Sequence, residues 1–317
     1  MAQKSETNLL HFSEDDSDDS TADDPSFLLN SVEAHQKYKM DYGSRGLAII
    51  IAHSTFEVAG WEGELGDRGC CQQDIDLSKR CFEGLGFDVE ILKDKKFHEI
   101  KQILNDMSKE DHSNRGCLAI IVSTHGTFDN FLFAYDSVYD LNELFKPFCA
   151  ANCVTLAGKP KLYFIQACRG ENAQSGIDLS VNEAQLSSED EKLAQNSGKM
   201  FFQATNEESS VDVAIFNEAY EDDDGGNHLD IKDDFLVAFS TIPDYVSFQR
   251  PGGSWFIKSL CKRLNKRTDR HLLHILTFVN WEIAIRHESN TPKRLNYHRK
   301  KQMSTVTSRL QKFLFFC

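Results

Sequence analysis

The chain has 317 residues, a net charge of −14 and nine cysteines, and its densest apolar run covers only residues 47–52. A run this short excludes a membrane-spanning helix, and we expect no secretory signal because the start of the chain lacks an apolar core. Cysteines without a framework of regular spacings are expected to be free thiols in a reducing compartment. We therefore predict a cytoplasmic protein.

Two segments carry the negative charge. Residues 1–24 contain eight acids and one lysine, and residues 171–233 contain sixteen acids and three lysines. Removing their charges of −7 and −13 from the total of −14 leaves +6 on the rest of the chain. We predict that residues 1–35 are disordered, since they cannot bury enough apolar area to offset their ordering entropy. A general acidic interaction protein is excluded, because the acidity lies outside the patterned body.

Strand and helix patterns alternate along the remaining residues. Predicted strands cover residues 47–52, 87–91, 117–122, 161–166 and 235–240; predicted helices cover 74–85, 97–107, 142–148, 254–266 and 272–286; an apolar stretch covers 306–316. Such an alternation predicts an α/β fold with a mostly parallel sheet and helices on both faces. The part after residue 233 has too few strands for a sheet of its own. We therefore predict that residues 171–233 are a linker that interrupts a single domain.

The sharpest motif is the strand that ends in Gln166-Ala167-Cys168-Arg169-Gly170. The carboxyl end of a parallel strand is where α/β proteins bind ligands. A thiol at that position can be partly exposed, and nearby positive charge would favour the thiolate, which is the form that attacks carbonyl carbons. A cysteine in an arbitrary sequence would more often be a buried free thiol, but this pentapeptide favours a nucleophile.

A second motif, Ser123-Thr124-His125-Gly126, follows the strand 117–122 and precedes Cys168 by about forty residues. Neighbouring parallel strands end at the same edge of a sheet, so we expect His125 and Cys168 to lie close together. A histidine at a strand end would, if it stood alone, more often be a solvated loop residue. Gly126 lacks a Cβ and lets its backbone N–H approach a developing oxyanion.

From Tyr38 onward the chain resembles the executioner caspases, of an invertebrate type. The matching motifs are Tyr38-Lys-Met-Asp-Tyr42, Ser108-Lys-Glu-Asp-His-Ser113, Gly158-Lys-Pro-Lys-Leu162, Gln166–Gly170, Gly253-Ser-Trp-Phe256 and His274-Ile-Leu-Thr277. The resemblance implies the caspase fold, a three-layer α/β/α sandwich whose six-stranded, mostly parallel sheet is completed by two subunits. These would be a large subunit at residues 36–170 and a small subunit at 234–317, with 1–35 as an acidic prodomain and 171–233 as the intersubunit linker.

The resemblance also implies roles for the site residues. Cys168 would be the nucleophile, His125 the general acid/base, and the backbone N–H groups of Gly126 and Cys168 the oxyanion hole. The activity would be that of an executioner caspase in apoptosis, which cuts proteins after aspartate and is made as a zymogen. No cofactor, metal, nucleic acid or membrane is implied. The partners would be substrates with aspartate at P1, the position before the cut, a second large/small-subunit pair in a homodimer, an upstream caspase and inhibitor-of-apoptosis proteins.

The substrate-binding residues implied by the resemblance are Arg68, Gln166, Ser247, Phe248 and Arg250. A guanidinium such as that of Arg68 binds a carboxylate through two hydrogen bonds. In this family an arginine follows the Ser-Phe pair, but here Gln249 follows it. Arg250 takes that place only if the loop shifts by one residue. We favour the shifted register, because Pro251 and a shorter loop before Gly253 leave room for the backbone to rearrange.

Two matters remain open in the sequence. The departure at Gln249 leaves room for a weakly active or non-catalytic relative that regulates active caspases by pairing with them. Small residues are favoured after a caspase cut, so Asp224 is the first choice for linker cleavage, Asp212 the second, and Asp19 the choice in the tail.

Overall fold

The computed structural model describes residues 36–61, 65–175, 210–211, 229–266 and 270–316. The residues from Lys37 onward belong to one compact unit. The disorder predicted for residues 1–35, and most of the predicted linker, fall outside the described residues.

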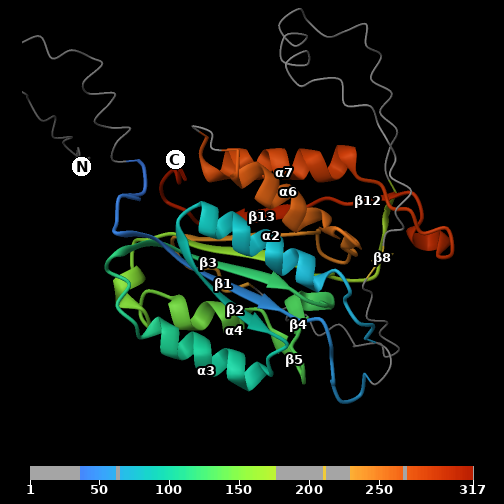
Figure 1. Cartoon of the computed structure of the whole chain (residues 1–317), viewed down its shortest axis with the longest axis horizontal. Helices are drawn as coiled ribbons and strands as arrows, with labels where there is room; N and C mark the ends of the chain where they lie inside the picture. Colours follow the sequence, from blue (N-terminus) through green and yellow to red (C-terminus); the bar gives the residue numbers. More distant parts are fainter. Residues whose placement is uncertain (1–35, 62–64, 176–209, 212–228, 267–269, 317) are drawn as a thin grey trace, which may run out of the picture. The chain divides into compact units, whose positions relative to one another are not determined.

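A sheet of six strands in the order β13-β9-β6-β3-β1-β2 lies at the centre of the described residues (Figure 1). Its strands are β1 (Ser44–Ala52), β2 (Phe87–Lys93), β3 (Arg115–Ser123), β6 (Lys161–Gln166), β9 (Phe235–Phe239) and β13 (Thr305–Ser308). Each neighbouring pair is parallel except β13 with β9, which is antiparallel. The predicted α/β fold with a mostly parallel six-stranded sheet is thus confirmed, and strands from both sides of the acidic segment share it.

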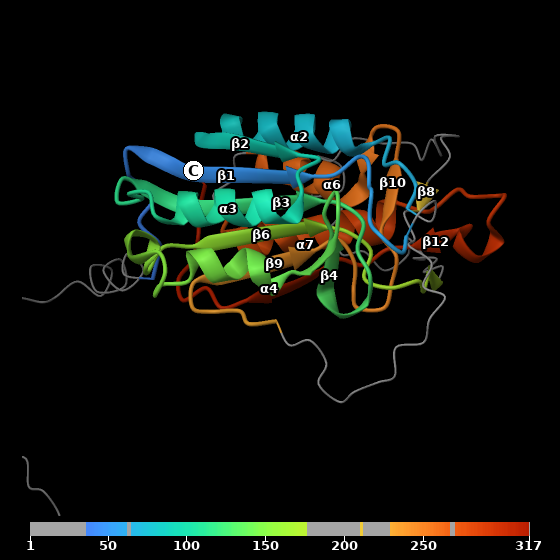
Figure 2. The ribbon, with the colours of Figure 1, turned by 90° about the horizontal axis from the view of Figure 1, so that it is seen from below.

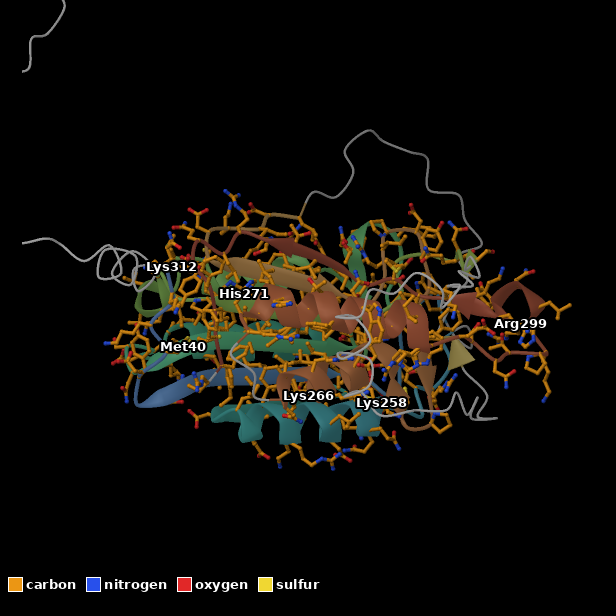
Figure 3. The ribbon with its side chains drawn as sticks, turned by 90° about the horizontal axis from the view of Figure 1, so that it is seen from above. Met40, Lys258, Lys266, His271, Arg299 and Lys312 are labelled. Atoms are coloured by element: carbon orange, nitrogen blue, oxygen red, sulfur yellow. The ribbon has the colours of Figure 1, made fainter. Side chains whose placement is uncertain are left out.

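Helices cover both faces of the sheet (Figures 1 and 2). On one face lie α2 (Cys71–Gly84), α6 (Trp255–Leu264) and α7 (Leu272–Arg286); on the other lie α3 (Phe97–Ser108) and the short α4 (Asn142–Phe145). Figure 3 looks onto the α6 and α7 face, where Lys258, Lys266 and His271 are labelled. None of the helices in the described part is long and apolar enough to cross a membrane.

Side-chain alternation along the buried strands builds two cores. In β1, Ala48, Ile50 and Ala52 belong to the core that includes α2, α6 and α7, whereas Ile49 and Ile51 belong to the core on the α3 side. Successive side chains of a strand point to opposite faces, so a strand covered on both faces must be apolar throughout. This is why continuous apolar runs, rather than alternating ones, mark the central strands of this chain.

Short strands of the described residues form small sheets separate from the six-stranded sheet. They are β4 (Phe131–Phe133) with β5 (Val138–Asp140), β7 (Gln174–Ser175) with β12 (Lys300–Lys301), and β10 (Phe248–Arg250) between β11 (Gly253–Ser254) and β8 (Ser210–Val211). All of these pairings are antiparallel. The strand β10 matters most for the site, because it carries the Gln249 and Arg250 alternatives.

Candidate active site

The register of β3 against β6 brings the two motifs together. Ser123 pairs with Gln166, and the N–H of Thr124 donates to the carbonyl of Gln166 at 3.1 Å. His125 and Cys168 each lie two residues beyond that pair, at the same edge of the sheet. A Cβ placed on Gly126 would lie 2.3 Å from the carbonyl oxygen of Cys168. The backbones of the two motifs are therefore in direct contact, and only glycine fits at residue 126.

Cys168, the candidate nucleophile, is 3% exposed. The backbone N–H of Ser247 points at its Sγ from 3.3 Å. An N–H donor aimed at sulfur stabilises negative charge there, and negative charge is what a nucleophilic thiolate carries. The loop before β10 thus stabilises the thiolate form of the candidate nucleophile.

The His125 imidazole is held by a backbone carbonyl. Its Nε2 lies 2.8 Å from the carbonyl oxygen of Gly66, and its ring packs against Phe56 with centroids 4.6 Å apart. Because a carbonyl can only accept, Nε2 carries the proton, and Nδ1 is then the basic nitrogen of the neutral ring. Sequence reasoning missed Gly66, and no side-chain signal could have revealed it, since every residue has a carbonyl group.

Arg68 is 1% exposed, and its guanidinium is hydrogen-bonded to other parts of the chain. Its Nη1 donates to the carbonyl oxygen of His53 at 3.3 Å and to Ser123 Oγ at 3.2 Å. These bonds fix the guanidinium beside Ser123 at the end of β3, and Ser123 is the residue that pairs with Gln166. A buried, oriented guanidinium is suited to binding a planar acid or amide.

An unanticipated carboxylate, Asp74, lies behind Arg68 in the first turn of α2. Its Oδ2 accepts from Ser123 Oγ at 2.8 Å, and its Oδ1 accepts from the N–H of Ser254 at 2.8 Å and from Ser254 Oγ at 3.0 Å. Burial raises the pKa of Asp74, while the charge of Arg68 and the bonds from Ser254 and Ser123 act in the opposite direction. Ser254 also caps α6, so Asp74 ties the starts of α2 and α6 to the Arg68 site.

The implied binding residues Gln166, Ser247 and Phe248 are all buried but differ in what their side chains contact. Gln166 is buried, and its Nε2 donates to Ser247 Oγ at 2.9 Å. Phe248 is also buried, and it stacks on Trp255 with ring centroids 4.9 Å apart. The structure therefore brings Gln166 and Ser247 to the thiol, whereas Phe248 belongs to the core.

Gln249, rather than Arg250, lies at Arg68. The Gln249 side chain is buried, and its Oε1 lies 3.5 Å from Arg68 Nη2 and contacts the sulfur of Cys70. Arg250 instead donates from Nη2 to the carbonyl of Glu288 at 3.0 Å. The pairing of β10 with β11 sets Gln249 opposite Ser254, and consecutive side chains of a strand point to opposite faces. This placement differs from the shifted register that we favoured from the sequence.

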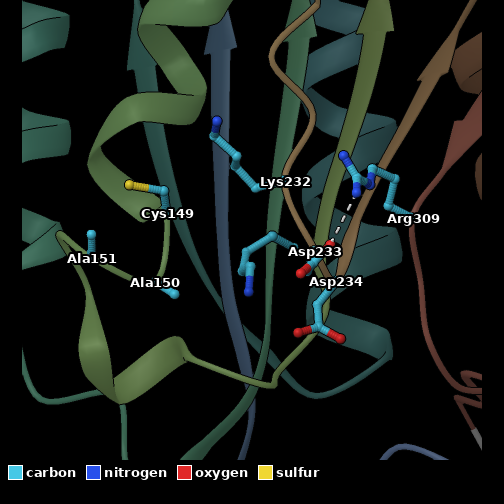
Figure 4. Close-up of a pocket in the computed structure, with 8 residues that line it drawn as sticks. Cys149, Ala150, Ala151, Lys232, Asp233, Asp234 and Arg309 are labelled. Atoms are coloured by element: carbon cyan, nitrogen blue, oxygen red, sulfur yellow. Dashed lines mark ion pairs between the residues drawn. The ribbon is translucent and has the colours of Figure 1, made fainter.

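A cavity of about 390 Å³ lies at the other edge of the sheet (Figure 4). Its lining residues are Cys149, Ala150, Ala151, Lys161, Lys232, Asp233, Asp234 and Arg309. Lys161 begins β6, whereas Gln166 ends it, so a whole strand separates this cavity from Cys168.

Within the described ranges, no group of three or more His, Cys, Asp or Glu side chains could hold a metal ion. The three candidate cleavage sites, Asp224, Asp212 and Asp19, lie outside the described residues.

Comparisons with known proteins agree with this geometry. A family profile described as the caspase domain matches residues 45–315. Caspase-1 of Spodoptera frugiperda is 34% identical over 281 residues, covering 88% of this chain and 81% of the relative. Caspase-3 of Bos taurus is 32% identical over 317 residues, covering 98% of this chain and 94% of the relative. The crystal structure of Caspase-1 from Spodoptera frugiperda superposes with a TM-score of 0.70 at 33% identity, covering 89% of this chain and 93% of that one.

Proposed function

The chain belongs to the caspase family of cysteine endopeptidases, and on that premise we propose that it cuts proteins after aspartate as an executioner-type caspase in apoptosis. One observation carries the proposal. The backbone contact between Gly126 and Cys168 sets a thiol, an imidazole and two N–H groups at one sheet edge.

The chemistry follows from that arrangement. Nδ1 of His125 takes the thiol proton, and the Cys168 sulfur attacks the carbonyl carbon of the scissile peptide bond. The carbonyl oxygen becomes an oxyanion that accepts from the N–H groups of Gly126 and Cys168. Collapse of this intermediate expels the amine, which takes the proton from His125 and leaves a thioester. Water then adds to the thioester carbon and gives a proton to His125, and that proton returns to the sulfur as the carboxylic acid product leaves.

The preference for aspartate is supported by the Arg68 guanidinium. It is buried, oriented by Ser123 and the His53 carbonyl, and close to the amide of Gln166 through the Ser123–Gln166 pair. A substrate carboxylate at this point would receive charge-assisted hydrogen bonds in a site shielded from water. Such bonds are about twice as strong as neutral ones.

Activation and assembly belong to the same proposal. Cutting residues 171–233 would separate the part that carries β6 from the part that carries β9, while the sheet holds them together. The edge strand β13 pairs with β9 among the described strands, which leaves its other side for a second copy and so for a homodimer. An upstream caspase and inhibitor-of-apoptosis proteins are the further partners we propose. Described cysteines such as Cys71, Cys81 and Cys117 are free thiols, which supports a reducing compartment such as the cytoplasm.

The deciding experiment is a tetrapeptide cleavage panel on the purified protein before and after linker cleavage. Cleavage after aspartate by the wild type, but not by Cys168→Ala, is the expected result. Turnover by Cys168→Ala equal to that of the wild type would refute the assignment.

The observed position of Gln249 favours a second candidate, a weakly active or non-catalytic regulator that acts by dimerisation. A carboxamide in place of a charged partner for the substrate weakens the grip on a carboxylate. The same panel separates the two candidates, because a regulator of this kind would cleave the aspartate peptides weakly or not at all.

A further inference from the structure

Arg68 is the cation that serves the substrate end of this site. We call Arg68, Asp74, Ser123, Gln166 and Gln249 the Arg68 cluster, since hydrogen bonds and the Ser123–Gln166 pair join them. Within this cluster Arg68 carries the one positive charge. Asp74 is a potential negative charge two hydrogen bonds away. The cluster therefore carries a net charge of zero when Asp74 is ionised and at most one positive charge when Asp74 is protonated.

Two carboxamides, those of Gln249 and Gln166, are the neutral amide groups of the Arg68 cluster. Gln249 turns its Oε1 toward Arg68 Nη2 at 3.5 Å. Gln166 donates through Nε2 to Ser247, and its Oε1 is buried without a hydrogen-bond partner in the part of the chain that the structure describes. A buried acceptor left unpaired costs about 1–3 kcal/mol, which a ligand that brings an N–H donor would recover.

Aspartate and asparagine meet this cluster differently. A carboxylate brings only acceptors, so both glutamine amides would have to turn their N–H₂ ends toward it. An asparagine amide brings an oxygen for Arg68 and N–H donors for the unpaired Oε1 of Gln166. With one cation present, the charge advantage of aspartate is smaller than in a site with two guanidiniums.

From this we infer that Gln249 is a specificity-determining residue and that the site accepts asparagine as well as aspartate at the P1 position. The inference rests on the proposed function, since it names the substrate class of the same site. A site built to pair a substrate group rejects an analogue that lacks it by about 10⁴-fold or more. Here we expect the ratio of kcat/KM for aspartate over asparagine to be below about 10²-fold.

The test uses four peptides with the same residues at the preceding positions and Asp, Asn, Glu or Ala at P1. The value of kcat/KM for each peptide is measured with the wild type, Gln249→Arg, Gln249→Glu and Gln102→Arg, and the ratio of the Asp value to the Asn value is compared. We expect Gln249→Arg to raise the ratio of aspartate over asparagine by about 10²-fold or more, and Gln249→Glu to lower it below the wild-type value. Gln102→Arg is the matched control, because it adds the same charge on an exposed position of α3, across the sheet.

A second readout separates this inference from the proposed function. The dissociation constants (Kd) of the Asp and Asn peptides are measured with Cys168→Ala, which binds the peptides without cutting them. The ratio of the two dissociation constants then gives the preference for aspartate over asparagine in binding. A ratio of about 10⁴-fold or more, or a ratio that neither Gln249 variant changes, overturns the inference even if the enzyme cuts after aspartate. Similar binding of both peptides without any turnover by the wild type would support the inference and overturn the proposed function. Failure of both peptides to bind would overturn both.

Discussion

The imidazole Nε2 of His125 lies 2.8 Å from the carbonyl oxygen of Gly66, 59 residues earlier in the chain. Gly66 precedes Arg68 by two residues, so one loop contacts the candidate acid/base and carries the arginine that we propose for substrate binding. Because the loop backbone accepts a hydrogen bond from Nε2–H, Nδ1 is the nitrogen that exchanges protons with Cys168 in the proposed mechanism. In the proposed function, orientation of the histidine and recognition of the substrate are thereby coupled through a short stretch of main chain.

The first prediction concerns the two reacting side chains. Cys168→Ala and His125→Ala should each abolish detectable peptidase activity, since nucleophile and acid/base act as a unit, while the far-ultraviolet circular dichroism stays unchanged. Cys149→Ala is the matched control, because that thiol lies at the opposite edge of the sheet. Loss of activity in Cys149→Ala, or its survival in His125→Ala, would contradict these roles.

Gly126 gives a second prediction, from sterics alone. An alanine Cβ would lie 2.3 Å from the Cys168 carbonyl oxygen and 2.8 Å from the Cβ of Ala167, so the two strand ends must separate. We expect Gly126→Ala to lower kcat by about 10²-fold or more, as loss of one oxyanion donor does. Gly84→Ala, where a Cβ would meet nothing within 4 Å, should leave kcat unchanged. Equal rates for the two variants would show that Gly126 is not part of the oxyanion hole.

The third prediction concerns acid stability. Burial lowers the pKa of His53 to about 4, against the usual value of about 6.5 in the unfolded chain. The unfolded state therefore binds a proton that the folded state refuses, and stability is lost as the pH falls from about 6.5 toward about 4, by up to about 3 kcal/mol. In His53→Gln the side chain can still donate to the Lys95 carbonyl but does not titrate. Its free energy of unfolding in urea should therefore fall less than that of the wild type when the pH is lowered from about 7 to about 4.5. The exposed His98→Gln is the control, and identical losses in all three proteins would refute the prediction.

Particular residues show how far the sequence could lead. The fold was predictable, because buried strands such as β1 and β3 are continuous apolar runs and β6 ends in a recognisable motif. The proximity of His125 and Cys168 followed from parallel strands that end at one edge. The Gly66 carbonyl was not predictable, since any residue supplies one. The orientation of Gln249 depends on the pairing of β10 with β11, a register that the residue types around Pro251 did not reveal.

The fourth prediction concerns activation. If the acidic linker is the processing region, the active small chain should begin after Asp224, or failing that after Asp212, and the large chain after Asp19, because small residues favour cleavage. N-terminal sequencing of the active chains identifies the sites. Asp224→Ala should delay processing, and a small chain that begins within β9 would contradict the linker assignment.

The last prediction compares two arginines on opposite sides of β10. Arg68 is buried and its Nη2 faces Gln249, whereas Arg250 donates to the Glu288 carbonyl and lies over the Trp255 ring at 5.7 Å. Arg68→Ala should lower kcat/KM for an aspartate peptide by about 10²-fold or more, since losing a buried charge partner costs about 3–5 kcal/mol. Arg250→Ala should change kcat/KM by less than about threefold, because a strand alternates its side chains and Gln249 occupies the inward place. If substrate binding shifts β10 by one residue, Arg250 would replace Gln249 at Arg68, and Arg250→Ala would then be as damaging as Arg68→Ala. Measuring both variants on one peptide therefore decides which residue of β10 faces the substrate.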